Sequence, residues 1–266
     1  MRAFLSIVLL LLACASVAQA GSLRIALGVQ NNLSPAPGQS ARGGAQSGGL
    51  IAFNEDLARE ICRRINARCV TRHVLFGEIL PGIEGGKFEL GFGNYLRTPE
   101  REKQVAFSDP LWRSSSRLLA APATTQRFTR RLGREPDLAS LRGARLGVVA
   151  ETQQHRYLQS IAQAQELTVL TAPTIGDALT LLREGKVDFC LFPMLSAYAM
   201  LNSEPAGAFE FAGRPLTESG LGGTVHIALP KTDGALREGV NQAIAAMRAD
   251  GTYHRIVRRH FPFSLD

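Results

Sequence analysis

The sequence predicts an α/β protein built from two lobes. Segments typical of strands alternate with amphipathic helices, which indicates parallel strand pairing. This alternation occurs twice, before and after about Ser114, in units of roughly 100 residues each, a common domain size. The composition of the 266 residues, 45% hydrophobic and 20% charged, suits a globular protein with a sizeable core and excludes a disordered tail, a collagen-like fibre or a coiled coil.

The first 20 residues predict a secretory signal peptide. Arg2 precedes an apolar run over 3–13, and V-A-Q-A at 17–20 supplies an A-x-A cleavage pattern. The run is too short for a permanent membrane span, so we expect an exported protein of the periplasm. The residues L-L-A-C at 11–14 also resemble a lipoprotein box, in which Cys14 would carry a lipid anchor.

The charge pattern does not favour nucleic acid as a partner. Loss of Arg2 with the signal peptide lowers the net charge from +7 to +6. Basic residues are scattered except for one group, which is Arg127, Arg130, Arg131 and Arg134. A solvated helix or loop face explains this group more simply than a nucleic-acid patch, and export points the same way.

The first unit begins with a strand over 23–29, followed by a Gly, Ser and Gln-rich loop over 31–49. An amphipathic helix comes next, with Glu55 and Arg59, and Glu60 and Arg64, spaced for i, i+4 pairs. Its apolar face consists of Phe53, Leu57, Ala58, Ile61, Cys62 and Ile65. The remaining predicted elements are a strand at 69–76, a helix at 79–84, a turn at 85–87 and a strand at 88–92.

The second unit repeats the pattern and leads into a final helix over 234–249, which Asp250 and Gly251 end. Its predicted strands are 117–121, 145–149, 168–171 and 187–192, and its predicted helices are 153–165 and 175–184. Because ligands of such sheets bind outside the carboxyl ends of the strands, we expect the site in the cleft between the lobes.

Three cysteines follow the signal peptide. Cys62 and Cys69 are spaced to join a helix end to the start of the next strand, and an oxidising compartment would let them pair. Two free thiols are the alternative. Neither a C-x-x-C motif nor a nearby histidine pair supports zinc. Cys190, in the apolar run F-C-L-F, is predicted to be a small buried core residue.

No catalytic or cofactor motif is recognisable. The five histidines include no H-E-x-x-H arrangement, and no histidine stands in a known pattern beside a nucleophilic serine. The segments 82–88 and 43–49 lack the spacing of a phosphate-binding loop and are interpreted as turns. We therefore expect no catalytic residue, no metal and no cofactor.

Several motifs together resemble a known family. They are F-N-E-D-L-A at 53–58, R-T-P-E-R at 97–101, V-A-F-S-D-P at 105–110, L-R-G-A-R-L-G-V at 141–148, G-K-V-D at 185–188 and A-D-G-T-Y at 249–253. Over essentially the whole mature chain, the sequence resembles periplasmic solute-binding proteins of the polar amino acid type, family 3. The spacing of Cys62 and Cys69 is also similar to a disulfide in basic amino acid binders of that family.

The resemblance implies a two-lobed periplasmic binding protein fold of type II, each lobe a mostly parallel sheet flanked by helices. Lobe 1 would be discontinuous, comprising 21–113 and 216–266, and lobe 2 would be 114–215. Crossover segments near 113–116 and 217–222 would act as hinges. It also implies a monomer that binds a small carboxylate-bearing ligand, such as an amino acid, and delivers it to the membrane permease of an ABC transporter.

Arg101 is the first candidate binding residue. Thr98 suits an N-cap, Pro99 the first helical position and Glu100 the positive end of the helix dipole. Arg101 opposes that dipole, which fits either a solvated surface or a guanidinium that binds a carboxylate beside free backbone N–H groups. The resemblance implies the second role, because the family places its carboxylate-binding arginine here.

The resemblance implies further ligand contacts, which are Phe76, Asn94, Leu96, Thr152, Gln153 and Pro193. Two of them depart from the family pattern. Leu96 stands where the family has Ser or Thr, and Pro193 where it has the aspartate that pairs with the ligand's α-ammonium. The loop around Asn31 also lacks the family's aromatic residue. The sequence thus keeps the anion-binding arginine and loses the acid for the ammonium, unless Glu151, otherwise a solvated loop residue, replaces it.

These observations predict a periplasmic solute-binding protein for ABC-type uptake. The loss of the ammonium ligands leaves an alternative, an accessory or sensory periplasmic protein with the same fold that transports nothing. An enzyme is the least favoured class. If the acid is missing, α-amino acids should lose most of their usual advantage over their deaminated analogues.

Overall fold

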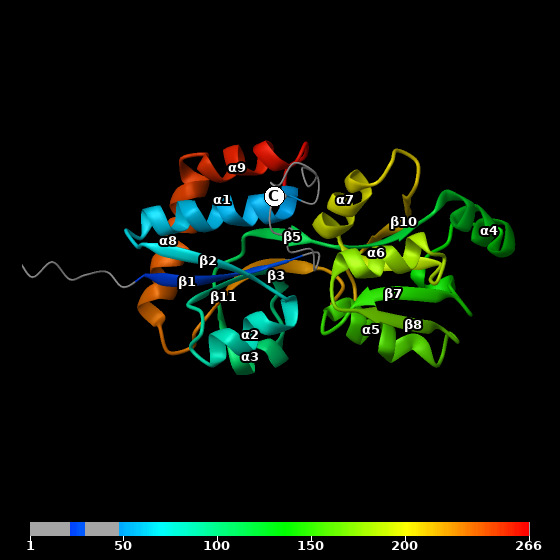
Figure 1. Ribbon diagram of the computed structural model, residues 1–266, viewed down its shortest axis with the longest axis horizontal. Helices are drawn as coiled ribbons and strands as arrows, with labels where there is room; N and C mark the ends of the chain where they lie inside the picture. The colour runs from blue at the N-terminus through cyan, green and yellow to red at the C-terminus, as the bar shows by residue number, and fades with distance from the viewer. Residues whose placement is uncertain (1–21, 30–47, 266) are drawn as a thin grey trace, which may run out of the picture.

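The structure, a computed structural model, describes residues 22–29 and 48–265. The predicted signal peptide and most of the Gly, Ser and Gln-rich loop lie outside the described residues. The described part forms two α/β lobes that lie side by side along the long axis of the molecule (Figure 1). The predicted class and the two lobes are therefore confirmed.

The first lobe contains a six-stranded sheet in the order β2-β1-β3-β11-β4, with β5 paired to β11. Its strands are β1 (Leu23–Gly28), β2 (Cys69–Val74), β3 (Leu90–Leu96), β4 (Ala106–Phe107), β5 (Trp112–Ser114) and β11 (Gly223–Leu229). Its helices are α1 (Gly48–Arg64), α2 (Phe76–Glu84), α3 (Pro99–Gln104), α8 (Gly234–Ala249) and α9 (Thr252–His260). Helices α1, α8 and α9 cover one face of the sheet, and α2 covers the other (Figure 1).

The second lobe contains a five-stranded sheet in the order β10-β6-β9-β7-β8. Its strands are β6 (Ser116–Ala120), β7 (Arg145–Val149), β8 (Thr168–Ala172), β9 (Phe189–Pro193) and β10 (Glu210–Leu216). Its helices are α4 (Pro122–Leu132), the short 3₁₀ helix η1 (Leu138–Ser140), α5 (Gln153–Ala162), α6 (Ile175–Arg183) and α7 (Met194–Ser203). Helices α4 and α5 pack on one face, and α6 and α7 on the other.

Both sheets are mixed, whereas the sequence predicts mostly parallel ones. β1 pairs in parallel with β2 and β3, and β7 with β8 and β9, but β11 and β6 run antiparallel to all their neighbours. Parallel pairing requires a crossover connection within the lobe. β6 and β11 each arrive directly from the other lobe, so they enter their sheets reversed.

The predicted apolar face of α1 forms part of the core of the first lobe. Phe53, Leu57 and Ile61 are fully buried and pack in one cluster with Val240 of α8 and Tyr253 of α9. A stripe of this kind supplies most of a helix's stability in a folded protein, because each large side chain contributes about 1.5–3 kcal/mol when removed from water.

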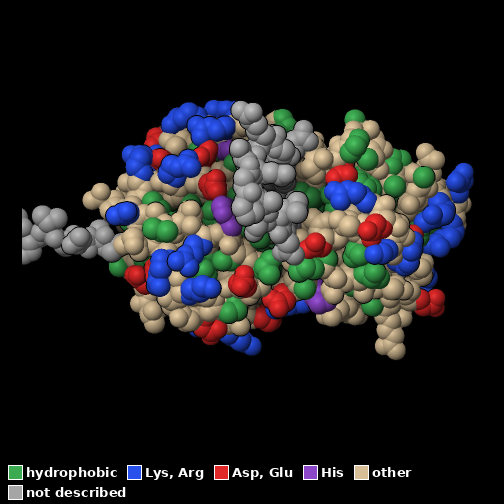
Figure 2. All heavy atoms as spheres, in the orientation of Figure 1, with side chains coloured by type: hydrophobic (Ala, Val, Ile, Leu, Met, Phe, Trp, Pro, Cys, Tyr) green, Lys and Arg blue, Asp and Glu red, His purple; other side chains and the backbone are tan. Residues whose placement is uncertain are grey.

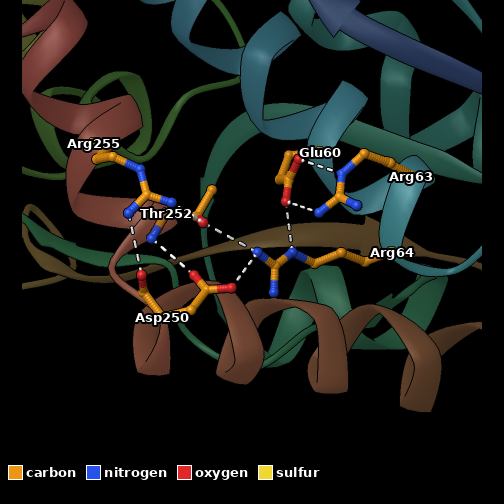
Figure 3. Close-up of polar contacts among 6 residues, drawn as sticks. All are labelled: Glu60, Arg63, Arg64, Asp250, Thr252 and Arg255. Carbon is orange, nitrogen blue, oxygen red and sulfur yellow. Dashed lines mark hydrogen bonds and ion pairs between the residues drawn. The ribbon is translucent and has the colours of Figure 1, made fainter.

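Ion pairs and hydrogen bonds connect the end of α1 to the junction between α8 and α9 (Figure 3). The predicted Glu60–Arg64 pair forms at 2.7 Å, and Arg64 also donates to Asp250 at 2.6 Å and to Thr252 at 3.2 Å. The hydrogen bond from Arg63 is the main cause that lowers the pKa of Glu60 to about 2. The predicted pair of Glu55 with Arg59 is wrong.

Asp56 and His73 account for that difference. Arg59 pairs with Asp56, three residues earlier, and Glu55 accepts a hydrogen bond at 3.1 Å from His73 on the neighbouring strand β2. Asp56 also contacts Arg259 and His260 of α9, at 2.6 and 2.9 Å. A partner from another element has thus replaced the local i, i+4 pair.

The three cysteines have the predicted roles. Cys62, in the last turns of α1, and Cys69, the first residue of β2, form a disulfide with a Cα–Cα distance of 6.3 Å. Cys190 is a free, fully buried thiol, and its burial raises its pKa well above the usual range. Cys190 is therefore a protonated thiol that packs as an apolar residue of the core.

Helix α7 also connects the lobes, in addition to the two crossover segments. The ring of Tyr198 on α7 lies 5.0 Å from that of Phe263 and 6.4 Å from that of Phe261, in the segment after α9. Leu195 of the same helix belongs to the core cluster of the first lobe. Helix α7 therefore packs on both lobes.

The basic surface group lies on and just after α4, as a solvated helix face. In Figure 2 basic side chains gather at that end of lobe 2. Arg127 pairs with Asp188, and Arg134 with Asp137, both at 2.7 Å. Within the described residues, no helix is long and apolar enough to cross a membrane.

Candidate functional site

A cavity between the lobes gathers all of the ligand-contact residues predicted from the sequence. Its walls come from the carboxyl ends of β1 and β3 in lobe 1 and of β7 and β9 in lobe 2, which is where an α/β sheet presents its ligands. The predicted residues on these walls are Phe76, Asn94, Leu96, Arg101, Thr152, Gln153 and Pro193. Their role in binding stays a prediction at this point.

Arg101 is a buried cation on the wall. Thr98 caps α3 by accepting a hydrogen bond from the Arg101 backbone N–H at 3.4 Å, with Pro99 at the first helical position, as predicted. Arg101 is 5% exposed, and its Nη1 donates to the carbonyl oxygen of Leu96 at 2.8 Å. Burial lowers its pKa to about 10, so the guanidinium is charged at neutral pH.

Aromatic rings take the place of an acidic partner around this guanidinium. Its central carbon lies 4.9 Å from the ring centre of Tyr95 and 5.7 Å from that of Phe76. Such contacts stabilise a desolvated cation by about 2 kcal/mol. No Asp or Glu among the described residues forms an ion pair with Arg101, and its side chain donates one hydrogen bond within them, to Leu96, so most of its donors remain to bind an anion.

The second lobe presents the N-terminal turn of α5 to the cavity. Thr152 caps this helix by accepting a hydrogen bond from the His155 N–H at 3.1 Å and donating to the Val149 carbonyl at 2.7 Å. Gln153 is the first helical residue, and its buried side-chain nitrogen has no hydrogen-bond partner within the described part of the chain. This turn adds unpaired N–H donors to the wall.

Asn94, Leu96 and Pro193 occupy the strand ends. Asn94 adopts a left-handed conformation, with φ of 54°, and follows Gly93. A side chain on Gly93 would collide with the ring of Tyr95, 2.4 Å from its Cβ position. Pro193 ends β9 opposite Ser116. Both departures from the expected pattern, Leu96 and Pro193, therefore lie on the cavity wall itself.

A buried hydrogen-bond chain connects the cavity to both crossovers. Gln154, on the wall, donates from Nε2 to the hydroxyl of Ser116 at 2.8 Å, and Ser116 donates to the Leu221 carbonyl at 2.6 Å. Ser116 belongs to the first crossover and Leu221 to the second. A side chain on the cavity wall is thus hydrogen-bonded to the segments between the lobes.

Sequence reasoning missed part of the wall. Thr174 lines the cavity as the N-cap of α6, donating to the Asp177 carboxylate at 2.6 Å and accepting from its N–H at 3.1 Å. The pattern T-x-x-D directly after a strand could have identified it. Ser196, one turn into α7, carries no comparable signal.

Comparison with known proteins decides the family. The family model described as bacterial extracellular solute-binding proteins, family 3, matches residues 33–263. The chain belongs to this family. The family is one of solute-binding proteins, and the resemblance stated from the motifs is confirmed.

Curated relatives extend over nearly the whole chain. The solute-binding protein is 27% identical over 244 residues to a histidine-binding periplasmic protein of Salmonella typhimurium, covering 91% of this chain and 89% of that protein. It is 26% identical over 243 residues to the lysine/arginine/ornithine-binding periplasmic protein of Escherichia coli, covering 91% and 88%. These relatives are periplasmic proteins named for amino acid ligands.

Solved structures show the same fold. An ancestral arginine-binding protein bound to glutamine superposes with a TM-score of 0.72 at 24% identity, over 91% of this chain and 98% of that one. An arginine-specific periplasmic binding protein of Salmonella typhimurium gives 0.73 at 20% identity, over 90% and 99%. At these identities the superpositions establish the fold alone.

Proposed function

We propose that this family 3 protein is exported to the periplasm, where it captures a small carboxylate-bearing ligand between its lobes and presents it to an ABC-transporter permease. The observation that carries the proposal is the buried guanidinium of Arg101, which lies on the wall of the interlobe cavity and lacks a carboxylate partner among the described residues. A ligand carboxylate would supply that partner.

The two lobes would close on this ligand as discontinuous units, 21–113 with 216–266 and 114–215. The crossovers near 113–116 and 217–222 would be the hinges. Arg101 and Phe76 would hold the ligand from lobe 1, and Thr152 and Gln153 from lobe 2. The ligand would thus complete a contact between lobes that neither makes alone, in a protein that acts as a monomer.

Replacement of Arg101 tests this proposal. Arg101→Ala should weaken the binding of a carboxylate by about 2–5 kcal/mol, because it removes one partner of a desolvated charge pair. Arg101→Lys should recover only part of the loss, since an ammonium cannot bind a carboxylate through two parallel hydrogen bonds. Titration calorimetry of the purified mature protein measures both.

Arg97 provides the matched control. It is exposed, lies four residues before Arg101 and pairs with Glu102, so Arg97→Ala removes the same charge without touching the cavity. Its dissociation constant should match that of the wild type. An Arg101→Ala variant that folds, shown by its thermal unfolding, and binds as tightly as the wild type would refute the proposal.

A further inference from the structure

The cavity wall carries a cation and no anion. Among the described residues that line it, Arg101 is the one charged side chain. Segment 30–47, which the structure does not describe, contains Arg42 and neither Asp nor Glu. Segment 1–21 also contains neither Asp nor Glu. Wherever these segments lie, they cannot supply a side-chain carboxylate to the site.

Acids near the site do not line the cavity itself. The Asp177 carboxylate accepts a hydrogen bond from the wall residue Thr174 at 2.6 Å. The Glu151 carboxylate lies against Gly77 at the start of α2, where a Cβ on that glycine would be 2.3 Å from Oε2. Glu151 does not line the cavity, but it lines an adjoining hollow that shares Phe76 and Arg101 with the cavity. Asp188, at the opposite end of β9 from Pro193, binds Arg145. The sequence-based alternative, that Glu151 replaces the missing aspartate, would require its carboxylate to move from Gly77 to the cavity.

Two side chains on the wall carry donors without a partner among the described residues. Arg101 gives one of its five N–H groups to the Leu96 carbonyl, and the side-chain nitrogen of Gln153 has no partner within the described residues. The hydroxyls of Thr152 and Thr174 already donate to neighbouring oxygen atoms. A ligand group placed against Arg101 and Gln153 must therefore supply acceptors.

The rest of the wall is largely apolar. Leu50, Phe76, Leu96, Ile175 and Phe192 line the space around the donors. A cationic side chain or an α-ammonium placed among these groups would lose its hydration without gaining a carboxylate, which costs several kcal/mol. The basic amino acids for which the relatives are named are therefore poor candidates.

We infer that the ligand is a net-anionic carboxylate with an apolar body and no ammonium group, of the class of 2-oxo or 2-hydroxy acids. This inference rests on the proposed function, and it names the substrate class of the same site. The carboxylate would pair with Arg101, and a 2-oxo or 2-hydroxy oxygen could accept a hydrogen bond from the N-terminal turn of α5.

Matched ligands test the inference. The mature protein, unfolded and refolded to remove any ligand from expression, is titrated by calorimetry with leucine, 4-methyl-2-oxopentanoate and 2-hydroxy-4-methylpentanoate. A second set is phenylalanine, phenylpyruvate and phenyllactate, and arginine and histidine are added singly. We expect the oxo or hydroxy acid to bind more tightly in each set, by tenfold or more in at least one, which corresponds to about 1.4 kcal/mol.

The outcomes separate the inference from the proposal beneath it. An amino acid that binds as tightly as its matched acids, or more tightly, overturns the inference and leaves carboxylate capture intact. Failure of every compound to bind refutes the proposed function itself. The variant Glu151→Gln should leave all affinities unchanged, and a loss confined to the amino acids would identify Glu151 as the ammonium partner and overturn the inference.

Discussion

Removal of the Cys62–Cys69 disulfide should destabilise lobe 1 by an amount that the structure sets. The bond closes a loop with a sequence separation of 7 between the end of α1 and the start of β2. The chain-entropy relation for a loop of about eight residues gives about 8 cal/mol/K, or about 2.5 kcal/mol at 25 °C, through the unfolded state. Hydrogen bonds such as Ala67 N–H to Cys62 O, at 2.9 Å, hold the same loop in the folded state.

The variant Cys62→Ala/Cys69→Ala should therefore fold, with a free energy of unfolding about 2.5 kcal/mol lower than that of the wild type. At about 2–4 °C per kcal/mol for a chain of this size, the melting temperature should fall by about 5–10 °C. Guanidinium unfolding monitored by circular dichroism gives the free energy. A reducing agent should lower the stability of the wild type by the same amount and leave the variant unaffected.

Ligand affinity should not change in this variant. Cys69 pairs with Leu23 at the amino end of β1, whereas the cavity begins at Gly28, the carboxyl end of the same strand. A rise of about 3.3 Å per residue separates these ends by most of the strand's length. Unchanged stability would refute the entropic reasoning, and a loss of affinity with unchanged stability would give the disulfide a role in shaping the site.

Three further outcomes are expected. Burial lowers the pKa of His226, so its neutral form is favoured in the folded protein; stability should fall as pH drops below about 6.5, the unfolded value, and His226→Gln should flatten this slope in melting temperatures measured between pH 5 and 8. Burial raises the pKa of Asp188, but hydrogen bonds from Arg145 outweigh it and lower the pKa; Asp188→Asn should cost about 1–3 kcal/mol in guanidinium unfolding at pH 7, a loss that a purely surface role would not produce. Tyr198→Ala removes the ring contact with Phe263 and should weaken ligand binding a few-fold with a more open form in small-angle scattering, whereas unchanged scattering and affinity would show that the contact does not hold the lobes together.

The sequence predicts elements whose side chains repeat with one clear period. The stripe containing Phe53, Leu57 and Ile61 identifies α1 because only one face is buried. Helix α7 has no such contrast: Leu195, Ser196 and Ala197 are consecutive and all buried, since the helix packs on both lobes. A helix buried on several sides has no polar face to define its period.

Helix α9 is also not predicted from the sequence, for a different reason. Gly251 adopts a left-handed conformation with φ of 74° and ends the predicted helix α8, as expected for a C-terminal glycine. The same residue is also the N-cap of α9, which starts at Thr252. Because one glycine both ends α8 and begins α9, the local sequence pattern cannot distinguish this junction from the end of the last helix.

The seven predicted wall residues came from the resemblance, because no local period connects Phe76, Asn94 and Pro193. Tertiary structure brings them together at strand ends that lie far apart in the chain. The partners of buried groups are hidden from the sequence in the same way. That the Glu151 carboxylate lies against Gly77 follows from the position of one lobe against the other.

Arg101 connects the charge of the ligand to the closure of the lobes. Arg101 is 5% exposed, and Tyr95 and Phe76 compensate for lost water around its guanidinium with ring contacts and not with a formal charge. If the lobes close without a ligand, the Arg101 cation loses more of its hydration and stays unpaired. If they close on a carboxylate, the cation gains an ion-pair partner. Under the proposed function, the anionic group therefore supplies the differential stabilisation that favours the closed form, and the apolar wall selects which anion supplies it.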